Sequence, residues 1–343
     1  MNSRTSQGVN ASSSLATPAK FNKMPTFAIV QKYYEICRQK RRLVFWAGFI
    51  AYFLSFALLL VSVPSLPKAI PFILTFQVES KSALYVTIFF ILAIFVFPAI
   101  FIYGICMVVF TFYARRDLAY YRRIYKAFFV AQALSKTFKR YSHQSDGGIP
   151  YDKIAQANIF RPADSHTSND LVTGKYKDVN FIQCDLHLYV ESTDSEGNTS
   201  LINTFYGRWL IFEFKKNFSS HLQVIGSHIK NYRIASENKY KIKLESDSFN
   251  KAFKVYGQDE LEARYILTPD IMERMEALSK KHHGKILFGF AGNQLHIAIA
   301  DGNDAFEPPA INKPLDEATE LAKVSEEIKV ITDIVDHLKL NRK

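Results

Sequence analysis

Two long apolar runs dominate the first third of the chain. Leu43–Val63 spans 21 residues and Leu84–Tyr113 spans 30, and neither run contains a charged residue. At about 1.5 Å per residue, a helix over the first run is roughly 31 Å long, close to the hydrocarbon thickness of a bilayer. The pattern therefore predicts a transmembrane helical hairpin over residues 27–113, with spans at about 43–63 and 84–113.

Basic segments flank both runs. Lys20–Arg42 contains seven Lys or Arg residues and one acid, Arg115–Arg140 contains eight and one acid, and the connector Pro64–Ala83 has two Lys and one Glu. The positive-inside rule then places both termini in the cytoplasm and the connector outside. The residues expected to contact lipid headgroups are Arg41, Arg42, Arg115, Arg116, Arg122 and Arg123.

The net charge of +11 is concentrated in these two flanks, so the pattern argues against a nucleic-acid partner and for a lipid bilayer. Residues 1–26 are expected to form a disordered tail, because they are mostly rich in Ser, Thr, Asn and Ala. Residues 114–150 are expected to form a basic juxtamembrane helix and a turn-rich linker. Whether that helix lies on lipid or packs on protein is left open by its alternating aromatic and basic residues.

The remaining residues, 151–343, predict one cytoplasmic α+β domain. Apolar and polar residues alternate along Asn180–Val190, and the pair Gly197-Asn198 marks a hairpin before a second strand at Leu201–Phe214. Further strands are predicted at Leu222–Ile225, Tyr240–Glu245, Ala252–Tyr256, Arg264–Leu267, Ile286–Phe290 and Leu295–Ala300.

Two helices complete the predicted domain. Thr268-Pro269-Asp270 is a helix start, with a capping hydroxyl, a proline at the first position and an acid in the first turn. Leu315–Leu340 predicts a C-terminal amphipathic helix, because its apolar residues form one stripe. The expected fold is thus a two-helix transmembrane hairpin followed by a cytoplasmic α+β domain, mostly antiparallel β with a C-terminal amphipathic helix.

Candidate chemistry is sparse. The sequence contains no recognised catalytic motif, its three Cys residues have no metal-ligand spacing, and no catalytic residue, metal or cofactor is predicted. Asp185 and His187 are two residues apart in a strand, so both face the same way and could act as an acid–base pair or bind a metal. The favoured interpretation is a solvated strand face. His296 is interpreted as a structural histidine.

A distinctive segment lies at residues 244–274. It contains Phe249-Asn250-Lys251-x-Phe253-x-Val255, followed by Glu262-Ala263-Arg264-Tyr265-x-Leu267-Thr268-Pro269. Taken alone, this pattern favours a tightly packed corner of two short strands, a turn and a capped helix over a ligand site. The segment also resembles the signature of a bacterial membrane family called "domain of unknown function 3137". Motifs upstream share the resemblance, at Gly174–Phe181 and Phe205–Phe212, and it covers roughly residues 120–310.

The resemblance gives the signature residues no known role; they are Phe249, Asn250, Phe253, Glu262, Arg264 and Pro269. It implies a helical membrane partner of the LemA type. The resulting hypothesis is a membrane-anchored binding or scaffold protein of a bacterial inner-membrane assembly, able to form homo-oligomers. The alternative is a membrane-tethered enzyme whose site is assembled from dispersed residues, for which Asp185, His187, Glu262, Arg264 and His296 are the candidates.

Overall fold

The computed structural model describes residues 25–62, 97–213, 219–238 and 240–340 of the chain. The described residues form two compact units. The sheet unit contains residues 129–306 together with residues from 321 onward, and the helix unit contains residues 25–128 together with 307–320. Because the second piece of the helix unit is a short connecting segment, we call residues 307–320 the strap.

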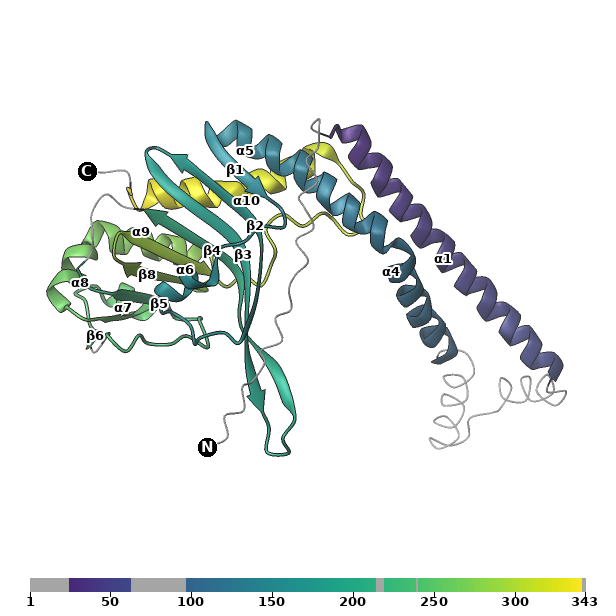
Figure 1. Cartoon of the computed structure of the whole chain (residues 1–343), viewed down its shortest axis with the longest axis horizontal. Helices are drawn as coiled ribbons and strands as arrows, with labels where there is room; N and C mark the ends of the chain where they lie inside the picture. Colours follow the sequence, from purple (N-terminus) through teal and green to yellow (C-terminus); the bar gives the residue numbers. More distant parts are fainter. Residues whose placement is uncertain (1–24, 63–96, 214–218, 239, 341–343) are drawn as a thin grey trace, which may run out of the picture. The chain divides into compact units, whose positions relative to one another are not determined.

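One antiparallel sheet of nine strands forms the centre of the sheet unit, in the order β1-β2-β3-β4-β9-β8-β5-β7-β6 (Figure 1). The strands are β1 (Arg140–Gln144), β2 (Ser165–Tyr176), β3 (Val179–Thr193), β4 (Thr199–Glu213), β5 (Leu222–Gly226), β6 (Tyr240–Ile242), β7 (Phe253–Gly257), β8 (Ile286–Ala291) and β9 (Gln294–Ile299). This arrangement confirms a mostly antiparallel β-sheet domain with helices.

The hairpin of β3 and β4 has the turn that the sequence predicts. The carboxylate of Asp194 accepts hydrogen bonds from the backbone N–H groups of Glu196 and Asn198, and Gly197 has a φ of +86°. A positive φ is easiest for glycine, which explains its place in this turn. The hairpin extends well beyond its neighbouring strands (Figure 1), since β2 pairs with β3 only as far as Tyr189.

Helices cover the sheet on both faces. They are α5 (Ala131–Thr137), α6 (Tyr151–Gln156), α7 (Asp247–Ala252), α8 (Glu260–Ile266), α9 (Pro269–Lys281) and α10 (Glu317–His337), and the π-helical turn η2 (Lys126–Val130) directly precedes α5. One face carries the apolar cluster that includes Cys184, Trp209 and Leu287 and packs on Ile154 of α6. On the other face, Arg208 donates a hydrogen bond to the backbone oxygen of Glu327 in α10.

Side-chain caps determine where α8 and α9 begin, which the pattern of apolar residues alone does not. The predicted strand at Arg264–Leu267 is instead part of α8, because the Asp259 side chain accepts from the N–H groups of Leu261 and Glu262 and starts a helix. The predicted start of α9 is confirmed, with Thr268 accepting from Ile271 N and Pro269 at the first position. The basic helix ends at Thr137, and the chain then enters β1. The sequence did not predict β1, β2 or α6.

The helix unit is built on α1 (Phe27–Ser62) and α4 (Phe97–Tyr125). An ion pair between Lys40 and Asp117 joins the two helices. Farther along, Gly48 of α1 lies directly against Cys106 of α4, so that a Cβ at residue 48 would overlap the Cys106 sulfur. A glycine at this point therefore permits the close approach of the two backbones.

The prediction of a transmembrane hairpin is wrong for the described part of the chain. No helix there combines the length and the apolarity that a membrane crossing requires. The basic segment before Leu43 belongs to α1, and α4 is described from Phe97 and continues past Tyr113 through Arg115 and Arg116. Each helix thus joins an apolar half to a charged half. The connector 64–83 and the tail 1–24 lie outside the described residues.

Candidate functional site

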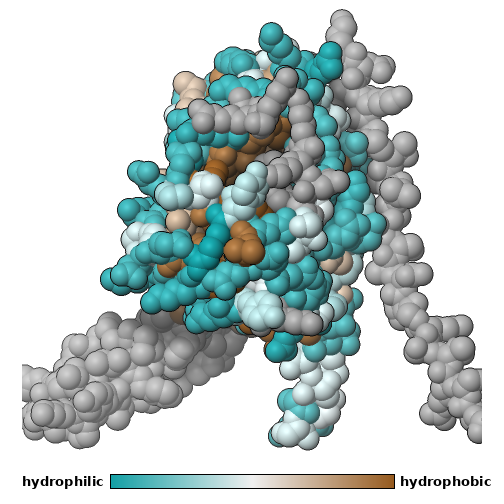
Figure 2. Space-filling view, turned by 90° about the vertical axis from the view of Figure 1, so that its left-hand side faces the viewer, coloured by the Kyte–Doolittle hydropathy of each residue, from teal (hydrophilic) through white to brown (hydrophobic). Residues whose placement is uncertain are grey.

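Large apolar side chains are exposed along the helix pair. Phe112 is 72% exposed and Phe101 is 70% exposed. Further exposed apolar residues on the two helices are Leu43, Phe45, Trp46, Phe49, Ile50, Phe53, Leu54, Ile100, Tyr103, Ile105, Val108, Val109 and Tyr113. The side of the sheet unit in Figure 2 is instead largely hydrophilic around a smaller apolar area. Extended exposed apolar surface indicates an interaction surface.

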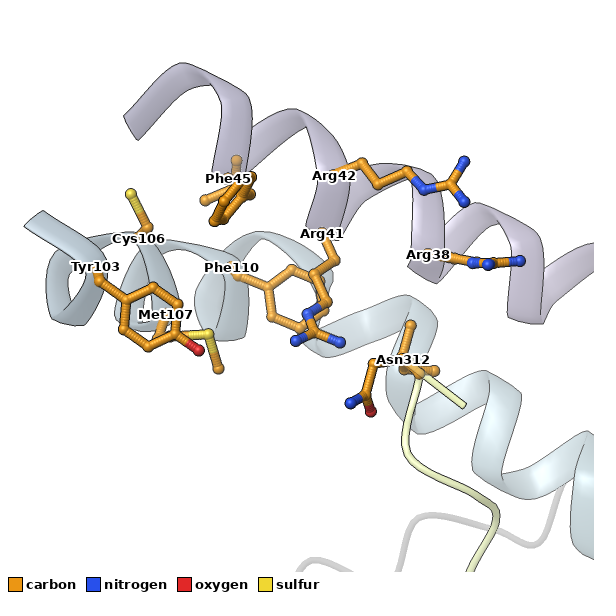
Figure 3. Close-up of a pocket in the computed structure, with 11 residues that line it drawn as sticks. Arg38, Arg41, Arg42, Phe45, Tyr103, Cys106, Met107, Phe110 and Asn312 are labelled. Carbon is orange, nitrogen blue, oxygen red and sulfur yellow. The ribbon is translucent and has the colours of Figure 1, made fainter. Parts of the chain in front are cut away.

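A cavity of about 420 Å³ lies in the helix unit, and we call it the arginine pocket (Figure 3). Its lining comes from α1, α4 and the strap and consists of Arg38, Arg41, Arg42, Val44, Phe45, Tyr103, Cys106, Met107, Phe110, Ile311 and Asn312. The volume falls within the range of about 300–1,000 Å³ that is typical of small-molecule sites. The pocket combines three cationic groups with a mostly apolar remainder.

The three arginines share one side of α1, because they are spaced three and four residues apart. Arg38 makes an ion pair with Glu35 at 3.5 Å. Neither Arg41 nor Arg42 makes an ion pair with any other residue that the structure describes. Arg41 extends across the pocket toward Asn312, whereas Arg38 and Arg42 lie along α1 (Figure 3). The local charge of this side is therefore only partly balanced.

The strap is fixed to the helices by side chains. The Tyr34 hydroxyl donates to the backbone oxygens of Ile311, at 3.3 Å, and Lys313. Tyr125 donates to the Glu320 carboxylate at 2.6 Å. Glu307 pairs with Lys126 at 3.1 Å and with Arg122 at 3.5 Å. These contacts place Ile311 and Asn312 in the wall of the pocket.

The six predicted headgroup residues divide into three groups. Arg41 and Arg42 line the pocket, and Arg115 and Arg116 are exposed on α4. Arg122 pairs with Glu307 of the strap, and Arg123 is exposed on the same helix. The sequence did not single out Arg38, Ile311 or Asn312 as site residues. The basic run before Leu43 could have indicated Arg38, but no local pattern indicates the strap residues.

The signature residues build a corner of the sheet unit. The rings of Phe249 and Phe253 are buried and lie 4.8 Å apart between centroids. The Asn250 side chain accepts from Leu244 N and donates to Leu244 O, which closes the turn before α7. Phe249, Asn250 and Phe253 therefore serve the packing of this corner.

The other signature residues are also held by local contacts. The Glu262 carboxylate accepts from Ser219 and Ser220, and these hydrogen bonds lower the pKa of Glu262 against the opposing effect of desolvation. Arg264 pairs with Glu245 and Glu260. Pro269 is the first residue of α9. The structure thus agrees with a packed β-β-α corner, with a helix, α8, where one strand was expected.

Asp185 is buried, so the expected solvated strand face is wrong at this position. Its side chain is 1% exposed and accepts from Ala305 N at 2.9 Å. Its register partner in β4 is Arg208, which pairs with Glu327 and, at 3.4 Å, with Asp301. The alternation of β3 indicates two faces correctly, but it cannot show that the segment before the strap and α10 cover the polar one.

The five candidates of the enzyme hypothesis do not form one site. His187 contacts Tyr189 and stacks on Tyr206, while His296 accepts from Trp209, whose ring belongs to the apolar cluster on the opposite face. Glu262 and Arg264 are held at α8 by the contacts described above. Within the described ranges, no group of three or more His, Cys, Asp or Glu side chains is arranged to hold a metal ion.

Fold and site together define an α+β protein with a basic, apolar helix pair. Residues 203–340 match the family described as "Protein of unknown function (DUF3137)". The match confirms the resemblance and contains all six signature residues, but it begins after the Gly174–Phe181 motif. No curated protein matches the chain.

Among solved structures, the chain is similar to one titled "crystal structure of the mycobacterial trehalose monomycolate transport factor A, TtfA". The two are 9% identical over 61% of this chain and 92% of that chain, with a TM-score of 0.32. A likeness at this level carries no functional argument.

Proposed function

We propose that the chain is a binding or scaffold protein that acts at the surface of the bacterial inner membrane. Its helix pair would contact anionic lipid, with apolar side chains inserted between headgroups and arginines bound to phosphates. The single observation that carries this proposal is the series of exposed large apolar residues on α1 and α4, with exposed arginines next to it in both helices. Interfacial helices bind lipid through this combination of apolar area and positive charge.

The proposal requires surface contact only, because the described helices do not span a bilayer. The anionic cytoplasmic leaflet is the surface that the two basic flanks would meet, so both chain ends are proposed to lie on that side. The exposed apolar residues would also accept an apolar helix. A LemA-like membrane protein, which the family resemblance implied, and a second copy of this chain are therefore kept as proposed partners.

Vesicle flotation of the purified full chain tests the lipid contact. We expect the chain to float with vesicles that contain phosphatidylglycerol and to stay unbound with phosphatidylcholine vesicles. Replacing Phe101 and Phe112 by Gln should reduce bound protein about tenfold or more, because two large apolar side chains would no longer leave water. Replacing Arg115 and Arg116 by Gln should weaken binding most at low salt, where surface electrostatics are least screened.

The matched control is Leu261→Gln, which removes a 79% exposed apolar side chain of the sheet unit. We expect this variant to float like the wild-type chain. An equal loss of vesicle binding in the control and in the Phe101/Phe112 variant would show that any exposed apolar residue of the chain contributes to nonspecific binding. Absence of wild-type flotation with anionic vesicles would refute the lipid-surface proposal.

A further inference from the structure

The arginine pocket differs from a purely charged surface, because its cationic side chains lie beside apolar ones. Arg41 is half-buried and reaches into the cavity, where Phe45, Met107 and Phe110 supply apolar surface. Phe110 is almost fully buried. A ligand that satisfies both parts must carry an anionic group and a hydrocarbon portion.

Charge complementarity specifies the anionic group further. No described carboxylate pairs with Arg41, which extends into the cavity, or with Arg42, which lies along α1 (Figure 3). An anion placed at Arg41 therefore meets a positive charge that no described acid compensates. The planar guanidinium group binds phosphate oxygens in pairs, which makes phosphate the group that these side chains recognise best.

The strap supplies a neutral polar group at the end of the pocket where Arg41 lies. The side chain of Asn312 faces Arg41 across the cavity (Figure 3) and can donate from its amide nitrogen to an oxygen of the ligand. Toward Tyr103 and Met107 the lining becomes apolar. This gradient from cationic to apolar within one cavity orients an amphiphile, with its head at Arg41 and its chain along α4.

We propose that the arginine pocket binds a single phosphate-headed lipid. The phosphate lies between Arg41 and Asn312, and an acyl chain lies along Phe45, Met107 and Phe110. The inference rests on the proposed lipid contact of the helix pair and adds one specific binding site to it. Binding at this site would be saturable, whereas contact of the exposed residues with a bilayer depends on the lipid area available.

Calorimetric titration of the full chain with dihexanoyl phosphatidylglycerol, below its micelle concentration, tests the site. We expect saturable binding of one lipid per chain. Dihexanoyl phosphatidylcholine should bind at least tenfold more weakly, because its head carries a compensating positive charge. Inorganic phosphate should also bind at least tenfold more weakly, because it lacks the acyl chain. Equal binding of inorganic phosphate would overturn the lipid assignment and leave a simple anion site.

Matched variants separate the pocket from the surface. Arg41→Gln should lower the affinity for dihexanoyl phosphatidylglycerol about tenfold, whereas Arg140→Gln, with the same change of charge at an exposed residue of β1 outside the pocket, should leave it unchanged. Both variants should unfold at the same temperature as the wild-type chain, which shows that both fold. An equal effect of the two variants on the short-chain lipid would overturn the pocket proposal.

The two proposals fail in distinguishable ways. A wild-type chain that floats with anionic vesicles but does not bind the short-chain lipid refutes the pocket alone. A wild-type chain that does neither refutes both. Saturable short-chain binding that persists in Arg41→Gln would place the lipid elsewhere on the helix pair and would likewise refute the pocket.

Discussion

At the scale of single residues, Asp185 shows how burial controls a charge. Its Oδ2 accepts from Ala305 N, and its Oδ1 has no hydrogen-bond partner among the described residues. Burial, with repulsion from Asp170 as a second cause, raises the pKa of Asp185 to about 8. The carboxyl group is therefore mainly neutral at a pH at which an exposed aspartate is ionised.

This shift predicts a pH-dependent effect of Asp185→Asn. The folded-state pKa lies above the ordinary value of 3.8, so the stability that Asp185 contributes is fully present below about pH 4 and is lost as the pH rises toward 8. Asn cannot ionise, so we expect the variant to exceed the wild type in stability by a margin that grows from pH 4 to pH 8. The margin is up to about 5 kcal/mol and is measured by thermal unfolding of the full chain.

Asp194 provides a control, because its pKa is shifted in the opposite direction. Hydrogen bonds from Asn198 lower the pKa of this exposed carboxylate in the hairpin turn. Its contribution is present above the unfolded-state pKa and is lost as the pH falls, so Asp194→Asn should be less stable than the wild type at neutral pH. A margin for Asp185→Asn that does not vary with pH would contradict the raised pKa.

At the scale of elements, the contact of α1 with α4 depends on small groups. Gly48 is buried, and a Cβ there would overlap the Cys106 sulfur while lying at 3.5 Å from the Cys106 Cβ. The second distance is an ordinary van der Waals contact. The steric conflict thus comes from one atom, which a second substitution can remove.

We therefore expect the effect of Gly48→Ala on stability to change sign when Cys106 is replaced by Ala. In the wild-type background it should destabilise the helix pair by roughly 1–2 kcal/mol, because the helices must move apart. In a Cys106→Ala background it should be neutral or stabilising, because alanine favours the helix by about 1 kcal/mol over glycine. Denaturant unfolding of all four proteins gives the coupling energy. Equal effects of Gly48→Ala in both backgrounds would argue against this packing.

Predictability also varies by element. The strands β3 and β4 and the cap of α9 could be predicted, because alternation and a Thr-Pro-Asp start are local signals. The first part of β2 could not, since Ser165–Asn169 is polar and gains its strand form from pairing with β3. Arg264–Leu267 looked like a strand, but the cap at Asp259 determined a helix.

The candidate site was predictable only in part, for the same reason. Arg41 and Arg42 stand in a basic run next to apolar residues, so the sequence indicated them as lipid contacts. Asn312 reaches the same pocket from the strap, and the Tyr34 hydrogen bond that holds the strap joins residues 277 positions apart. No local pattern encodes such a contact.

At the scale of the whole molecule, the strap links two units that are interleaved in sequence. Ala305 and Phe306 are buried immediately before it, and the ring of Phe306 lies 6.1 Å from that of His143 in the sheet unit. Immediately after it, Val324 and Ile328 of α10 are buried. The residues that flank the strap thus belong to the sheet unit, while the strap itself belongs to the helix unit.

The hydroxyl of Tyr34 is the contact that holds the middle of the strap, because it donates to the carbonyls of Ile311 and Lys313. Tyr34→Phe keeps the ring and removes the hydroxyl, whose single proton is shared between the two carbonyls in a hydrogen bond worth about 1 kcal/mol. We expect the backbone amides within 307–320 to exchange with deuterium roughly fivefold faster, with exchange in α9 unchanged.

Tyr120→Phe is the matched control, because Tyr120 packs on the ring of Tyr33 and is partly exposed on α4. Its exchange pattern in the strap should equal that of the wild type. Unchanged exchange in Tyr34→Phe would mean that the two fixed ends alone hold the strap. Faster exchange confined to 307–320 would instead show that one hydroxyl on α1 holds the segment that supplies Ile311 and Asn312 to the arginine pocket.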